Sequence, residues 1–130
     1  MSIVGVVVAT AIGMVLGALW YSPALFGNQW MRSLGKTREE LGSPTLPMVG
    51  SVFASLLSAI GVALLHAWVG VDAVGMALSL GLALGLLIVF PALLSDNLFC
   101  GWGWDMLFIQ SGYRVVSVVL MSLAIYWIGG

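Results

Sequence analysis

The chain has 130 residues, of which 62% are hydrophobic and only 7% are charged. A soluble domain carries about 25% charged residues, so this composition excludes a protein with a water-facing surface. The formal net charge of −1 gives no basic field for nucleic acid, and one cysteine and one histidine exclude an internal disulfide and a metal centre built from such ligands. We expect neither a metal nor another cofactor.

Four stretches of the sequence are long and apolar enough to cross a bilayer, whose core of about 30 Å needs about 20 apolar residues in helical form. The few charged residues divide the chain at that spacing. We therefore expect an all-α polytopic membrane protein with a single transmembrane domain over residues 1–130. Its helices are predicted at 3–21, 46–69, 73–94 and 106–128, because only helices satisfy the backbone over such spans in lipid.

The first predicted helix carries a stripe of small residues at every fourth position: Gly5, Ala9, Gly13 and Gly17. Small side chains at this spacing let two membrane helices approach closely. We expect this stripe to be a helix-packing surface.

The cytoplasmic loop predicted at 22–45 contains a short helix of its own. Apolar residues recur there at helical spacing: Leu25, Phe26, Trp30 and Leu34. This pattern predicts an amphipathic helix that lies in the membrane interface and ends at Gly35. Thr37 and Glu40 then have the spacing of a capping box, in which each side chain accepts a hydrogen bond from the other residue's backbone amide.

The assignment of this loop to the cytoplasm rests on three of the four basic residues: Arg32, Lys36 and Arg38. The positive-inside rule places them on the cytoplasmic side, so we expect an inner-membrane protein with both termini in the periplasm. The tryptophans fall at predicted span ends, where an amphipathic ring is best accommodated. They are Trp20, Trp30, Trp102 and Trp104 at the inner interface and Trp68 and Trp127 at the outer one.

The second predicted helix carries three serines on one face: Ser51, Ser55 and Ser58. Serine hydroxyls can bond to the backbone of their own helix, so these residues need no ligand. They would form one side of a narrow polar seam if the fourth helix presents polar residues to them.

The third predicted helix repeats the stripe of the first, with Ala73, Ala77, Gly81 and Gly85 again four residues apart. The same offset carries Pro23-Ala24-Leu25 onto Pro91-Ala92-Leu93. We interpret this as two helical hairpins related as a parallel repeat, with chance as the alternative because glycine, alanine and leucine are abundant here. We expect close contact between the first and third helices, or alternatively packing of the stripes across a homo-oligomer interface.

Pro91 bears on where the third helix ends. Proline removes a backbone donor and clashes with the preceding turn, so the helix is predicted to kink or end near Phe90. Asp96 would then follow in a loop at the inner surface.

The fourth predicted helix contains Arg114, the one ionisable residue well inside a span. Gln110, Arg114 and Ser117 share one face, with Tyr113 beside them. A bare arginine in lipid costs at least about 2.5–3.5 kcal/mol, so Arg114 must face protein, water or a headgroup. It either pairs with a carboxylate, Asp96 or Asp105, or binds an anionic solute or lipid headgroup.

No arrangement of residues indicates an enzyme. His66 and Cys100 are predicted at opposite faces of a bilayer core about 30 Å thick, and all five acidic residues lie at or beyond span ends. We therefore expect no catalytic residues and no carboxylate-based proton exchange.

Several short motifs resemble a known family: Trp20-Tyr21-Ser22-Pro23, Phe26-Gly27, Trp30-Met31 and, in the last helix, Gly112-Tyr113. The family consists of small bacterial membrane proteins catalogued as a domain of unknown function, number seventeen sixty-one. The resemblance covers essentially the whole chain. It implies a bacterial four-helix membrane protein and supplies no activity or catalytic residues.

Three functions fit these features. The first is a small oligomeric carrier or channel-like protein for an unidentified solute, with the seam between the second and fourth helices as its path. The second is a non-catalytic accessory or structural subunit of a larger membrane complex. The third is a lipid-binding sensor that uses Arg114 and the interfacial helix. Four helices enclose little space, which favours a homo-oligomer or a larger complex in every case.

The charge distribution predicts the orientation in the membrane. In a Cys100→Ser background, Asp72→Cys or Gly130→Cys should react with a membrane-impermeant thiol reagent added to intact cells, whereas Lys36→Cys should not. Labelling at position 36 from outside would contradict the predicted orientation.

Overall fold

The computed structural model describes residues 2–37 and 39–129, so Arg38 and the labelling position Gly130 lie outside the described residues. Four helices within this part of the chain are long and apolar enough to cross a membrane. They are α1 (Ile3–Trp20), α3 (Thr45–Val69), a continuous helix formed by α4 (Val74–Leu84), η2 (Gly85–Val89) and α5 (Phe90–Cys100), and α6 (Trp104–Ile128). The prediction of an all-α, multi-pass membrane protein is confirmed, and its long helices expose apolar side chains to the lipid bilayer.

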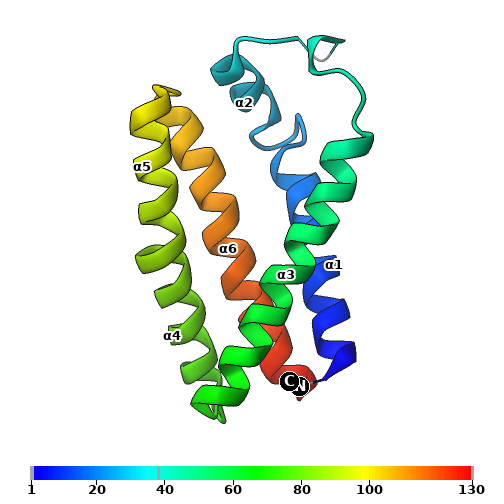
Figure 1. The fold of residues 1–130 in the computed structure, drawn as a ribbon, viewed down its shortest axis with the longest axis vertical. Coiled ribbons are helices and arrows are strands. Elements are labelled where there is room, and N and C mark those ends of the chain that lie inside the picture. The colour runs from blue at the N-terminus through cyan, green and yellow to red at the C-terminus, as the bar shows by residue number, and fades with distance from the viewer. Residues whose placement is uncertain (1, 38, 130) are drawn as a thin grey trace.

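The helix α6 lies at the centre of the bundle, with α1 and α3 on one side and α4 and α5 on the other (Figure 1). The first turn of α1 and the last turn of α6 meet, since a Cβ atom added at Gly5 would lie 3.8 Å from Ile128. We call this the terminal end and the opposite end, which holds α2 (Gly27–Leu34), the loop end. Buried apolar residues of α1, α3 and α6 form the core: Val6, Ala9, Ala59, Val62, Ala63, Met121 and Ile125.

The third span is longer than the sequence predicted. It passes through Pro91 and ends only at Gly101, whose φ of 70° is left-handed. The π-helical segment Gly85–Val89 directly precedes the proline, and its wider turn accommodates the proline ring and the missing N–H group. The predicted boundary at residue 94 is therefore wrong, and Asp96 lies inside the helix rather than in a loop.

The small-residue stripe of the third span packs against the backbone of α6. A Cβ atom added at Gly81 would lie 2.8 Å from the Cα atom of Val119, and one added at Gly85 would lie 3.1 Å from the Cα atom of Val115. A backbone atom cannot move aside as the end of a side chain can. The contact therefore depends on glycine at both positions.

The stripe of α1 packs against the other side of α6. A Cβ atom added at Gly17 would lie 3.1 Å from the hydroxyl oxygen of Tyr113, and one added at Gly13 would lie 2.8 Å from the terminal methyl of Met121. The predicted contact between the first and third spans is therefore wrong, because each stripe contacts α6 instead. The common origin of the two hairpins stays a prediction.

The loop predicted to be cytoplasmic contains the short helix that its apolar spacing indicated. The helix α2 spans Gly27–Leu34 and ends at Gly35, whose φ is 69°. The capping box forms as well: the Glu40 amide donates to Thr37 Oγ1 (3.4 Å), and the Thr37 amide donates to the Glu40 carboxylate (3.3 Å). It precedes only the single 3₁₀ turn Glu39–Leu41. The place of α2 in the membrane interface stays a prediction.

The close approach of α4 to α6 predicts different behaviour for two glycines of one helix. Gly81→Ala should lower the free energy of unfolding by about 1–3 kcal/mol, because the added methyl group pushes the two backbones apart. Gly75→Ala should cause no loss, since no atom lies within 4 Å of the added carbon. Thermal unfolding in detergent measures both, and equal midpoints would contradict the packing of Gly81 on α6.

Candidate functional site

The loop end of the bundle is organised by Trp20, the last residue of α1. Its indole Nε1 donates a hydrogen bond to the backbone oxygen of Ile109 in α6 (2.9 Å). Its ring lies against Gly112, where an added Cβ atom would meet the ring carbon Cζ2 at 2.8 Å. The ring of Phe26 packs on it at 4.9 Å between centroids. A tryptophan that reaches α6 in this way requires glycine at position 112.

The turn between α1 and α2 is closed by its own hydrogen bonds. The Phe26 amide donates to the Trp20 carbonyl (3.0 Å), and the Gly27 amide donates to the Ser22 carbonyl (2.9 Å). The Ser22 hydroxyl donates to the Leu19 carbonyl (2.7 Å). A Cβ atom at Gly27 would lie 2.7 Å from the carbonyl carbon of Ser22, so the turn has no room for a side chain there. The turn thus fixes the direction of α2.

A chain of aromatic rings connects α2 to α6. The Trp30 and Tyr21 rings meet edge to face at 5.2 Å, and the Tyr21 and Tyr113 rings do so at 5.6 Å. The buried Tyr113 hydroxyl donates to the Gly13 carbonyl of α1 (2.7 Å). We call these three rings and the Trp20–Phe26 pair the aromatic cluster: Trp20, Tyr21, Phe26, Trp30 and Tyr113.

Arg114 lies at the edge of the aromatic cluster. Its guanidinium carbon is 5.0 Å from the centroid of the Tyr113 ring, which is cation–π geometry. The side chain is exposed on the surface of the bundle. It forms no ion pair with Asp96, with Asp105 or with any other carboxylate in the described part of the chain. The predicted ion pair is therefore not present in the structure.

Tyr21 provides a second hydrogen-bond donor beside Arg114. Burial raises the pKa of Tyr21 to about 12, and the positive charge of Arg114 acts in the opposite direction. The phenol therefore stays protonated at every physiological pH. Neither its hydroxyl nor the Arg114 guanidinium has a hydrogen-bond acceptor among residues 2–37 and 39–129. Both side chains lie against the Tyr113 ring, and donors without an acceptor suit an anionic group.

The structure does not assemble the predicted polar seam between α3 and α6. Ser55 is buried, but its hydroxyl points to α1, where it contacts the Met14 sulfur at 3.7 Å. Ser51 and Ser58 are exposed on the bundle surface. The serine stripe therefore does not face Arg114.

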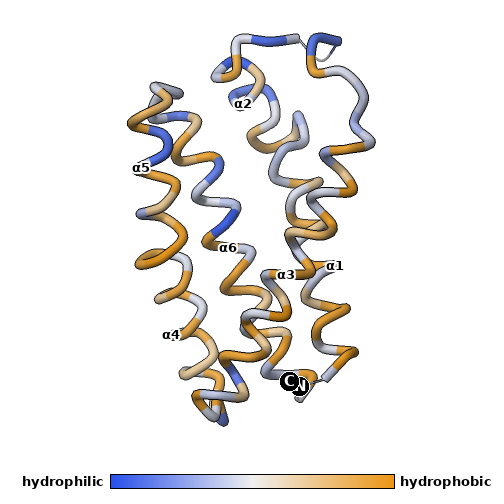
Figure 2. The backbone as a smooth tube through the Cα atoms, viewed as in Figure 1, coloured by the Kyte–Doolittle hydropathy of each residue, from blue (hydrophilic) through white to orange (hydrophobic). Residues whose placement is uncertain are grey.

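The polar residues of α6 lie in three different environments: Ser117 is buried, Gln110 is half-buried and Arg114 is exposed. Figure 2 shows hydrophilic residues on α6 toward the loop end, whereas most of the helix toward the terminal end is hydrophobic. The hydrophilic residues of α6 therefore lie toward the loop end, and the apolar core lies toward the terminal end.

Sequence reasoning missed a buried link at the terminal end. His66 Nε2 and Ser122 Oγ are 2.8 Å apart, and the Ser122 hydroxyl donates to the Ala77 carbonyl (2.6 Å). Because the single hydroxyl hydrogen of Ser122 is used in the bond to Ala77, the Ser122 oxygen accepts a hydrogen bond from His66 Nε2. The link joins α3, α6 and α4. Two lone polar residues, one near the end of the second span and one near the end of the fourth, were the signal that could have revealed it.

Within the part of the chain that the structure describes, no group of three or more His, Cys, Asp or Glu side chains is placed to hold a metal ion. The side chains around Arg114 offer aromatic rings and hydrogen-bond donors.

The comparison with known proteins agrees with the sequence motifs. The family described as "Protein of unknown function (DUF1761)" matches residues 4–126, a range that includes the whole aromatic cluster and Arg114. No curated protein and no solved structure matches the chain significantly. The resemblance noted from the motifs is thereby confirmed, and the description of the family assigns no activity.

The bond from Trp20 to α6 predicts different roles for two tryptophans. Trp20→Phe should lower the free energy of unfolding by about 0.5–1.5 kcal/mol, because phenylalanine cannot donate to the Ile109 carbonyl. Trp127→Phe should have little effect, since Trp127 is 68% exposed. Thermal unfolding followed by circular dichroism compares the two variants. A wild-type midpoint for Trp20→Phe would show that the bond does not contribute to stability.

Proposed function

This chain belongs to the DUF1761 family of proteins of unknown function, and we propose that it is a membrane protein that binds an anionic group at Arg114. The observation that carries the proposal is an exposed arginine within a membrane-spanning helix, without a carboxylate partner in the described part of the chain. In this proposal the protein binds its ligand and does not transform it.

The depth of Arg114 explains why it needs an anion. It lies ten residues after Trp104, or about 15 Å along α6 at 1.5 Å per residue. An uncompensated arginine at such a depth costs several kcal/mol. The planar guanidinium presents paired N–H donors that match the oxygens of a phosphate or carboxylate. The Tyr21 hydroxyl would add a donor, and the Tyr113 ring holds the guanidinium in position.

The ligand would reach this site from the loop end or from the lipid beside α6. The apolar core of α1, α3 and α6 toward the terminal end supports this direction, and the buried polar groups there, His66 and Ser122, already bond to each other. With the orientation that we propose from the basic loop residues, the loop end faces the cytoplasm. The phosphate of an anionic lipid in that leaflet and a small soluble anion offer the same chemistry to Arg114.

A carrier or channel role is compatible with this site only in an assembly. One bundle is closed at the terminal end by its core, so a transported anion would need a path between several copies or between the chain and a partner. A non-catalytic subunit of a larger complex is the second candidate. The exposed arginine supports it, because a carboxylate of the partner protein would then occupy the place of the anion.

Lipid retention tests the proposal. Native mass spectrometry of the purified protein should show preferential binding of phosphatidylglycerol over phosphatidylcholine with the same acyl chains. Arg114→Gln should reduce the affinity for phosphatidylglycerol at least about tenfold, or 1.4 kcal/mol. The control variant Arg32→Gln removes the same charge from α2 at the same end of the bundle and should leave the affinity unchanged.

The raised pKa of Tyr21 adds a prediction on pH. Because the phenol stays protonated well below pH 12, the affinity should not change between pH 6 and 9, and Tyr21→Phe should lower it throughout. Phosphate protection against thermal unfolding that depends on Arg114, without lipid selectivity, would identify a soluble anion instead. Equal lipid and phosphate binding by wild type and Arg114→Gln would contradict the proposed function.

A further inference from the structure

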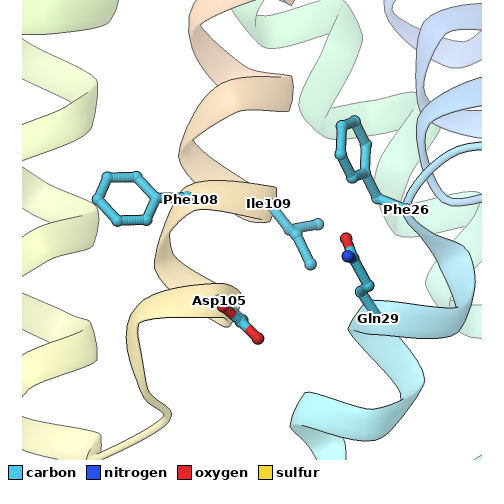
Figure 3. Close-up of a pocket in the computed structure, with 5 residues that line it drawn as sticks. All are labelled: Phe26, Gln29, Asp105, Phe108 and Ile109. Atoms are coloured by element: carbon cyan, nitrogen blue, oxygen red, sulfur yellow. The ribbon is translucent and has the colours of Figure 1, made fainter.

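A cavity lies at the loop end, between α2 and the first turn of α6. Its volume is about 250 Å³, and it is lined by Phe26, Gln29, Asp105, Phe108 and Ile109. Figure 3 shows the side chains of Asp105 and Gln29 approaching the same space from α6 and α2. We propose that this cavity binds a protonated primary amine. The site is separate from the anion site proposed at Arg114, which lies about 13 Å further along α6.

The two polar side chains that line the cavity, Asp105 and Gln29, both offer hydrogen-bond acceptors. The Asp105 carboxylate carries a negative charge and has no ion-pair partner among the described residues. The Gln29 carboxamide adds an acceptor oxygen from the facing helix. Asp105 lies in the first turn of α6, where the positive end of the helix dipole favours a negative charge. A ligand with several N–H donors and a positive charge complements this arrangement.

The other lining residues favour an organic cation over a metal ion. One carboxylate and one carboxamide are too few for Ca²⁺, which takes six to eight oxygen ligands. The Phe26 ring and the Ile109 side chain give the cavity an apolar wall (Figure 3). An aromatic ring attracts an ammonium group, and an apolar wall accepts the carbon chain attached to it. A primary alkylammonium group has both the charged N–H donors and the carbon chain that these walls accept.

The position of the cavity indicates two sources for such an amine. Trp102 and Trp104 flank the start of α6, and tryptophans at span ends mark the depth of lipid headgroups. The ammonium group of phosphatidylethanolamine therefore lies at the right depth, and a soluble alkylamine could enter from the same side. Both present the same R–NH₃⁺ group to Asp105.

The binding of two probes by the full chain tests the proposal. Native mass spectrometry in detergent compares phosphatidylethanolamine with phosphatidylcholine of the same acyl chains, and thermal unfolding measures protection by ethanolamine. Asp105→Asn, which keeps the shape of the side chain and removes its charge, should reduce binding at least about tenfold, equivalent to 1.4 kcal/mol. Gln29→Leu should reduce it several-fold. Asp96→Asn removes an equal charge from the exposed face of α5 and should have no effect.

The outcomes separate the ligand sources and the two proposed sites. Selective retention of phosphatidylethanolamine that depends on Asp105 supports a lipid ligand, and protection by ethanolamine alone with the same dependence supports a soluble amine. Arg114→Gln should leave both unchanged, so a failure of the anion site does not affect this result. Equal retention of phosphatidylcholine, which has no N–H group, or binding that ignores Asp105 would overturn the proposal. If Asp105→Asn does not fold, the exposed Gln29→Leu decides in the same way.

Discussion

The close packing of α6 against helices on both of its sides is the constraint on which the bundle depends. Lipid is as apolar as the side chains, so helices associate through contact between their surfaces rather than through exclusion of water. In the apolar 18-residue stretch of each span, 39% of the residues are buried in α6, against 22% or less in the other spans. This difference identifies α6 as the central helix. Glycines supply the contact, Gly81 and Gly85 on one side and Gly17 on the other.

The candidate anion site follows from the same packing. Gly17 leaves room for the Tyr113 ring, and the carbonyl of Gly13 accepts a hydrogen bond from the Tyr113 hydroxyl. Tyr113 is thereby fixed between α1 and α6, and the next residue, Arg114, is directed to the surface with its guanidinium over the ring. The Tyr113 side chain thus both joins α1 to α6 and positions the guanidinium of the candidate site.

Local patterns in the sequence predicted the fold, whereas partners between helices could not be read from it. Hydropathy and charge spacing located the four spans, and the Thr37–Glu40 spacing located a capping box, because each depends on neighbours in the chain. The stripes of small residues indicated close approach but carried no information on which helix approaches. The π-helical segment that lets Pro91 continue a helix also escaped prediction. The cavity beside Asp105 depends on the direction of α2, which the turn at Gly27 sets through contacts with the backbone.

The π-helical segment Gly85–Val89 contains more residues per turn than the helices on either side of it, and this sets the rotational phase between the two halves of the third span. One additional residue rotates everything that follows by about 100° about the helix axis, since 3.6 residues complete a turn. With this phase, Gly81 of α4 faces α6 while Asn97 of α5 still turns inward, where its side-chain amide donates to the Gly103 carbonyl and closes the connection to α6. Loss of a single residue there would leave a span long enough for the bilayer but would turn Asn97 away from that connection. The length of this helix and the direction of its far end are therefore set separately, and a relative that differs by one residue in this segment would differ in which α5 side chains face the bundle.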